Sequence, residues 1–136
     1  FVTVNNTGWD NHTDLATYAN RHPGDPNQGK YALIPGLDLA FSALIEDLEA
    51  RGMLDETLVV VMGEFGRTPR INKPGGRDHW GNIAPLMLAG GGLEMGQVVG
   101  QSTRNVGEPL TRPYRIDNLV GTIFNTLFDV GELRLN

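Results

Sequence analysis

The sequence predicts a single α/β domain over residues 1–136, in which helices pack on a mostly parallel sheet. Continuous apolar runs are typical of buried parallel strands, and two longer stretches carry apolar residues at the three- and four-residue spacings of amphipathic helices. Short links rich in glycine and proline connect these segments. A chain of 136 residues can bury one core but is too short for two ordinary domains.

The first half of the chain is expected to contain a strand, two loops and a helix. Residues 1–4 are apolar and β-branched, which predicts a buried strand. A polar loop follows at 5–14, and turn-forming residues over 20–30 predict an exposed loop. The first helix is expected over 33–48, because its apolar residues fall on one face; Gly52 then provides a natural C-terminal stop.

The second half is expected to contain the centre of the sheet and another helix. Residues 57–62 form a continuous apolar run, the pattern of a central parallel strand buried on both faces. A third strand is predicted at 83–89, closed by a glycine turn at 90–92, and a short edge strand at 97–100. A second amphipathic helix is expected to start at Ile116.

Composition excludes several classes of function. The net charge is −5 and the basic residues do not cluster, which argues against a nucleic-acid partner. No apolar run approaches the roughly 20 residues that span a bilayer, so membrane insertion is not expected. The chain has no cysteine, which excludes disulfides, thiolate metal sites and cysteine nucleophiles. Any metal must therefore be held by His, Asp, Glu or Asn side chains.

Candidate ligands gather near the ends of the predicted strands. Ligands of open α/β sheets bind beyond the carboxyl ends of the strands. The carboxylate and imidazole side chains expected there, which we predict to hold a divalent metal, are Asp10, His12, Glu64, Asp78 and His79. Such donors suit Zn, Mn, Mg or Ca. Arg67 and Arg77 are the predicted catalytic residues, because a guanidinium group can hold an anionic oxygen through two N–H groups.

Each of these residues also has a purely structural interpretation. His12 can be a solvated surface histidine, and Asp10 can be a turn residue. Glu64 ends an apolar strand, where its carboxylate can form an ion pair with Arg67 or Arg70. The arginines can simply neutralise nearby carboxylates.

Four motifs taken together carry a family resemblance. They are Gly-Trp-Asp-Asn-His at 8–12, Gly-Glu-Phe-Gly-Arg-Thr-Pro at 63–69, Gly-Arg-Asp-His-Trp at 76–80 and Leu-Ala-Gly-Gly-Gly at 88–92. In this order they resemble the C-terminal part of the domain-of-unknown-function 1501 family, a bacterial sulfatase-like branch of the alkaline phosphatase superfamily. The resemblance implies a partial α/β/α sandwich, and a periplasmic or extracytoplasmic location. Because residue 1 falls inside an expected strand, we expect the chain to be a C-terminal fragment of a larger sulfatase-like domain.

The resemblance also implies a chemistry. In that superfamily Asp and His ligands hold two divalent metals, and a Ser, Thr or formylglycine nucleophile attacks phosphate or sulfate esters. Asp10 and His12 resemble a metal-binding pair with a shortened spacer, and His79 resembles the last His ligand. Glu64 stands where the superfamily has an Asp ligand, whereas Phe65 stands where it has a His.

Three functions compete on this basis. The first is a metal-dependent hydrolase of anionic small-molecule esters, in which this chain supplies metal ligands but not the nucleophile. The alternative is a non-catalytic sulfatase-like module that has lost its metal site, an interpretation that Phe65 favours. A stand-alone nucleotide-binding domain is disfavoured, because no glycine-rich phosphate loop follows a first strand. An uncovered sheet edge would favour a homodimer.

Overall fold

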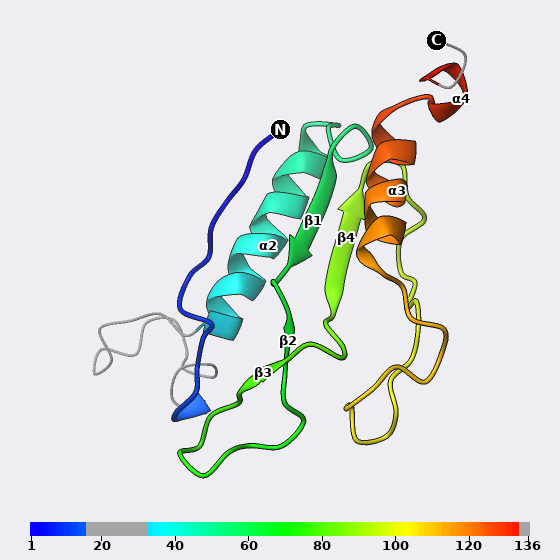
Figure 1. Cartoon of the computed structure of the whole chain (residues 1–136). Coiled ribbons are helices and arrows are strands. Elements are labelled where there is room, and N and C mark those ends of the chain that lie inside the picture. The colour runs from blue at the N-terminus through cyan, green and yellow to red at the C-terminus, as the bar shows by residue number, and fades with distance from the viewer. Residues whose placement is uncertain (16–32, 134–136) are drawn as a thin grey trace, which may run out of the picture.

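A computed structural model describes residues 1–15 and 33–133 of the chain. Its named elements are α2 (Leu33–Ala50), β1 (Leu58–Met62), β2 (Gly66–Arg67), β3 (His79–Trp80), β4 (Leu86–Gly90), α3 (Ile116–Leu127) and α4 (Val130–Leu133) (Figure 1). The loop predicted over 20–30 lies outside the described residues. In the described part of the chain, no helix is both long and apolar enough to cross a membrane.

The strands form two small antiparallel sheets. β1 pairs with β4, with Leu58 opposite Gly90 and Met62 opposite Leu86. β2 pairs with β3, with Arg67 opposite His79. Each sheet has two strands in the described part of the chain, so the prediction of a mostly parallel, sulfatase-like α/β/α sandwich is wrong. The chain is instead a small mixed α/β structure.

The antiparallel pairing follows from the connection between β1 and β4. Two parallel neighbours need a crossover of a dozen or more residues, usually a helix, to return the chain to the starting end of the sheet. The segment 63–85 contains glycines, prolines and the short strands β2 and β3, but no helix. It therefore leaves the end of β1 as a long loop and returns there, which makes β4 run in the opposite direction.

Other predicted strands also differ. Residues 1–4 are exposed and form no strand, and residues 97–100 form none either. The strand expected at 83–89 is β4, which begins later, directly after Pro85. Proline has no backbone N–H to donate to a ladder, which explains that delayed start. The strand predicted at 57–62 is β1, although its side chains are half-buried or exposed rather than covered on both faces.

The helix expected over 33–48 is α2. Its end is set by Gly52, which adopts a positive φ of 68°. The N–H of Met53 donates to the carbonyl of Leu48 at 2.8 Å, and the N–H of Gly52 donates to that of Glu49 at 2.9 Å. These two bonds form a Schellman motif, which favours glycine at the left-handed position.

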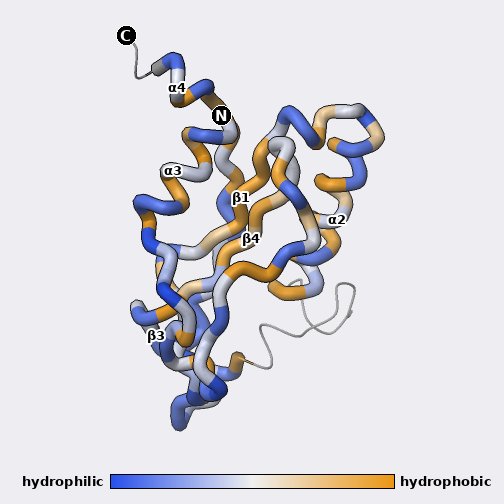
Figure 2. The backbone as a smooth tube through the Cα atoms, turned by 90° about the vertical axis from the view of Figure 1, so that its right-hand side faces the viewer, coloured by the Kyte–Doolittle hydropathy of each residue, from blue (hydrophilic) through white to orange (hydrophobic). Residues whose placement is uncertain are grey.

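The larger sheet lies between two helices. In both Figure 1 and Figure 2 the β1–β4 pair runs between α2 and α3, and Figure 2 shows apolar residues along both strands. The buried hydrophobic residues of the described chain are Leu48 on α2 and Ala89 on β4. Much apolar surface stays exposed, including Val120, Phe124 and Leu127 on α3. The homodimer stays a prediction.

The smaller sheet forms a separate, polar end of the molecule. β1 leads directly into β2, and β3 and the chain around residue 13 lie at the same end (Figure 1). Gly66 is buried here, and this position requires glycine because a side chain would collide with the carbonyl group of Ile83. Four of the predicted ligands, Asp10, His12, Asp78 and His79, come together at this polar end.

Candidate metal centre

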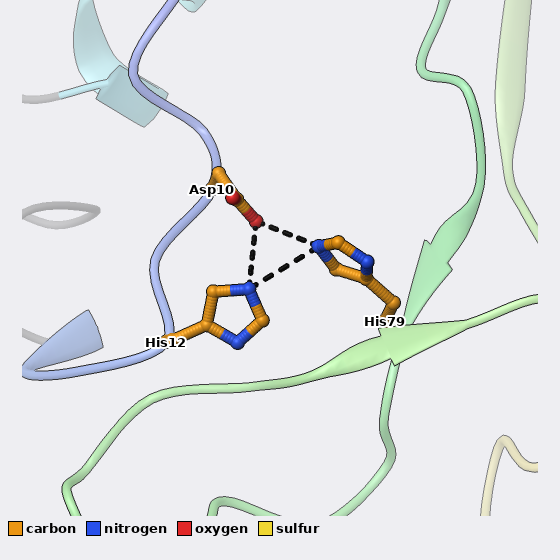
Figure 3. A group of neighbouring side chains, drawn as sticks. All are labelled: Asp10, His12 and His79. Carbon is orange, nitrogen blue, oxygen red and sulfur yellow. Dashed lines mark hydrogen bonds and ion pairs between the residues drawn. The ribbon is translucent and has the colours of Figure 1, made fainter.

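Three predicted ligands meet at a single point on the surface. Oδ1 of Asp10 lies 3.0 Å from Nε2 of His12 and 2.9 Å from Nε2 of His79. The two Nε2 atoms are 3.2 Å apart, so the three donors form a nearly equilateral triangle (Figure 3). We call Asp10, His12 and His79 the triad.

Backbone pairing between two distant loops brings the triad together. Thr13 forms an antiparallel bridge with Gly75, and the N–H of Arg77 donates to the carbonyl of Asn11 at 3.0 Å. These contacts hold the loop that carries Asp10 and His12 against the loop that precedes His79. Gly76 is buried at their closest approach, where a side chain would collide with the backbone of His12.

Arg67 joins the triad from the neighbouring strand. Because Arg67 lies opposite His79 in the β2–β3 pair, both side chains can reach the same carboxylate. Nη1 of Arg67 donates to Oδ1 of Asp10 at 2.7 Å. Hydrogen bonds from His79 and then from Arg67 lower the pKa of Asp10 to about 2. Asp10 is therefore a carboxylate throughout the neutral range.

The predicted ligand Asp78 lies behind His12 rather than in the triad. Its Oδ1 is 2.8 Å from Nδ1 of His12 and also accepts a hydrogen bond from Nδ2 of Asn72 at 3.1 Å. These two hydrogen bonds, first that with His12 and then that with Asn72, lower the pKa of Asp78. His12 is thus placed between two carboxylates, one at each ring nitrogen.

Phe65 packs against the triad. In the sequence, this residue stands where the resembled superfamily has a histidine ligand. The centroid of its ring is 4.2 Å from that of His79, and Cζ of Arg67 lies 5.6 Å from the centroid of the Phe65 ring. An aromatic ring at this position therefore supports both a triad imidazole and the guanidinium group beside it.

The other predicted residues lie apart from the triad. Glu64 is exposed, and within the described residues it forms no ion pair with Arg67 or Arg70. Nη1 of Arg77 donates to the carbonyls of Thr68 and Pro69, the latter at 2.7 Å, so this guanidinium group ties down the loop after β2. The predicted metal role of Glu64 and the catalytic role of Arg77 stay predictions.

Asn72 has a role that the sequence analysis missed. Its Nδ2 donates to the carbonyl of His12 at 3.0 Å, and its Oδ1 accepts from the N–H of Gly76 at 2.8 Å. The side chain thus bridges the two loops that form the site. Its place at the start of an Asn-Lys-Pro-Gly-Gly turn was the available signal, because Asn commonly bonds the backbone of such turns.

The triad fits a metal ion. A zinc ion lies about 2.0–2.1 Å from its nitrogen and oxygen ligands. The three triad donor atoms are 2.9–3.2 Å apart, close enough for one such ion to be held by Asp10, His12 and His79 together. The side chains of Asp10, His12 and His79 are 63%, 43% and 50% exposed, which leaves the outer side of such an ion open. The triad is therefore an exposed Asp/His/His group that could hold a metal.

Fold and site together define a small mixed α/β protein with an exposed candidate metal centre made of two imidazoles and a carboxylate. The chain belongs to the family described as "Protein of unknown function (DUF1501)", which matches residues 1–130. The resemblance of the four motifs to this family is thereby confirmed, whereas its sulfatase-like character stays a prediction. No curated protein and no solved structure matches the chain.

The low pKa of Asp10 gives a direct test of the site's hydrogen bonds. Titration of the metal-free chain, followed by carboxyl ¹³C NMR, is expected to place the Asp10 midpoint near 2. Because this pKa is below the ordinary value of 3.8, the carboxylate stabilises the fold above pH 3.8, and the contribution is lost as the pH falls towards 2. Arg67→Gln is expected to raise the midpoint. An Asp10 midpoint that Arg67→Gln leaves unchanged would contradict the contact between these two side chains.

Proposed function

We propose that this chain provides the divalent-metal site of a hydrolase that acts on phosphate or sulfate esters. The observation that carries the proposal is the triad, in which Asp10, His12 and His79 direct three donor atoms to one exposed point. Structural zinc sites are closed by four protein ligands, whereas catalytic sites use three and keep a position open for substrate. Three exposed donors match the second arrangement.

The donor types favour zinc among the four metals expected from the sequence. Mg²⁺, Ca²⁺ and Mn²⁺ prefer oxygen ligands, whereas imidazole nitrogen is a common ligand of Zn²⁺. The triad supplies two imidazole nitrogens and one carboxylate oxygen. When bound, such an ion would supply a Lewis acid that polarises a phosphoryl or sulfuryl oxygen.

The position of Arg67 favours an anionic substrate. Its side chain is 24% exposed and lies beside the triad through its bond to Asp10. One of its Nη1 hydrogens is directed at that carboxylate, and a guanidinium group has five N–H donors in all. The remaining donors can bind an oxygen of a phosphate or sulfate group next to the triad, in the paired geometry that such groups favour.

The resemblance of the four motifs to the DUF1501 family, which implies a sulfatase-like chemistry, is the second support for this substrate class. The proposal does not depend on the parallel sheet of that class, which the described residues do not form. It also assigns no nucleophile to this chain. Ser42 lies on α2 and donates to the carbonyl of Asp38 within the helix, so its hydroxyl serves the helix itself.

Anion binding tests the proposal on the chain itself. We expect the zinc-loaded chain to bind inorganic phosphate or sulfate, as measured by isothermal titration calorimetry. Arg67→Gln should weaken this binding by about tenfold or more, because a hydrogen bond to a charged group contributes roughly 1.5–3 kcal/mol. Arg51→Gln is the matched control, since Arg51 follows α2 directly and pairs with Asp47 in the last turn of that helix.

Three outcomes would count against the proposal. A chain that binds zinc but neither anion would lack the substrate contact that a hydrolase of these esters needs. A chain that binds no zinc at all would favour the alternative, a non-catalytic module without a metal site. Equal anion affinities of Arg67→Gln and Arg51→Gln would remove Arg67 from the substrate site.

A further inference from the structure

The two ring nitrogens of His12 face different partners. Nε2 belongs to the triad, whereas Nδ1 lies 2.8 Å from Oδ1 of Asp78. An ionised carboxylate can only accept hydrogen bonds, so the contact with Asp78 is a hydrogen bond when Nδ1 carries the proton. This contact is shorter than the 3.0 Å contact between Nε2 and Asp10, which favours the proton on Nδ1. In the neutral ring, the lone pair then resides on Nε2, on the side of the ring that faces Asp10 and His79.

That tautomer is the one a metal ligand needs. With its proton on Nδ1, neutral His12 presents a lone pair at Nε2, 3.0 Å from the carboxylate oxygen of Asp10. Two electron-rich atoms at this separation repel each other unless a cation lies beside them. Histidines that bind metals commonly donate their second N–H to a carboxylate, which sets the tautomer and the orientation of the ring.

Asp78 is itself held in place from two directions. Its Oδ1 accepts a hydrogen bond from Nδ2 of Asn72, which also binds the backbone carbonyl of His12. Its backbone N–H donates to Oγ1 of Thr68 at 3.1 Å, and its carbonyl accepts from the N–H of Thr68 at 2.9 Å. The carboxylate and the ring that it orients are therefore fixed to the same loop framework.

We propose that Asp78 is a positioning residue rather than a metal ligand, and that Asn72 and Asp78 together hold His12 in its Nδ1–H tautomer with Nε2 facing the metal. This inference rests on the metal site of the proposed function. It reassigns Asp78, which the sequence analysis placed among the ligands. It also gives Asn72 a specific task, which is to hold Asp78 and the His12 backbone in one geometry.

The tautomer can be measured without any metal. Long-range ¹H–¹⁵N NMR of the metal-free chain, under alkaline conditions where imidazoles are neutral, is expected to show His12 protonated at Nδ1. Asp78→Ala should shift the ring towards the Nε2–H form. Asp78→Asn should keep the wild-type tautomer, because its amide oxygen can still accept the Nδ1 proton. A wild-type His12 that is protonated at Nε2 would overturn the inference.

Zinc titration supplies the second readout. Loss of an outer carboxylate partner typically lowers metal affinity 10- to 100-fold, and we expect a loss of about this size in Asp78→Ala at unchanged stoichiometry. Asp78→Asn should recover most of the affinity. Asp55→Ala, an exposed change in the turn after α2, should bind zinc as the wild type does.

The outcomes separate this inference from the function on which it rests. If Asp78 were a direct ligand, Asp78→Asn would lose as much affinity as Asp78→Ala, which would overturn the positioning role. Wild-type affinity in Asp78→Ala would overturn it as well. A wild-type chain that binds no zinc would instead refute the proposed metal site. The NMR measurement of the His12 tautomer would then be the remaining test of whether Asp78 orients the ring.

Discussion

Gly76→Ala is expected to lower zinc affinity at least tenfold, although it adds one methyl group and touches no triad side chain. Gly76 is buried where the two site loops meet, and a Cβ atom there would collide with the carbonyl group of His12. The collision is with backbone, so it can be relieved only by moving His12. Overpacking of this kind costs about 1–3 kcal/mol of stability, and the same movement would pull Nε2 of His12 away from the triad.

Gly81→Ala is the matched control for this substitution. Gly81 lies just after β3, and a Cβ atom there would have no neighbour within 4 Å. Neither glycine has a positive φ, so alanine introduces no backbone strain at either position. Thermal unfolding followed by circular dichroism should show a lower Tm for Gly76→Ala alone. If Gly76→Ala binds zinc as tightly as Gly81→Ala, the close approach of the two loops does not determine the site.

The second large effect separates the triad from the wider set of ligands expected from the sequence. His79→Ala removes one of three donors and should lower zinc affinity by more than about 100-fold, beyond the range for outer-shell partners. Glu64→Gln should leave zinc affinity unchanged, because Glu64 is exposed and lies outside the triad. Competition titration with a chromophoric chelator measures both affinities.

This pair of variants has a clear contrary result. A loss of zinc in Glu64→Gln that equals the loss in His79→Ala would restore Glu64 to the ligand set predicted from its position after a strand. Unchanged zinc affinity in His79→Ala would show that His79 is not a ligand and that the triad does not hold the metal. Circular dichroism of both variants checks that neither change acts by unfolding the chain.

Local pattern predicted the helices well and the sheet poorly. The periodic apolar residues of α2, and the glycine that ends it, specify a helix through contacts within a few residues. The apolar run at β1 likewise indicated a strand, but its direction relative to β4 depends on the connection between them. An apolar run of this kind also occurs in buried parallel strands, so the run alone cannot distinguish the two pairings.

Part of the candidate site was predicted for a reason that did not hold. Asp10, His12 and His79 were expected to meet at the carboxyl edge of a parallel sheet, whereas two cross-linked loops and the β2–β3 pair bring them together. The residue types were nevertheless informative, because carboxylates and imidazoles are the side chains that can hold a divalent metal in a chain without cysteine. Asn72 could not be predicted, since its importance depends on contacts with residues up to 60 positions away.

X-ray absorption at the zinc K-edge of the wild-type chain with one equivalent of zinc tests the central claim most directly. Imidazole rings give a characteristic multiple-scattering pattern, so the spectrum counts histidine ligands. The triad predicts two imidazoles together with light-atom oxygen ligands at about 2.0–2.1 Å. A spectrum without imidazole scattering, or a chain that retains no zinc, would contradict a metal centre at Asp10, His12 and His79.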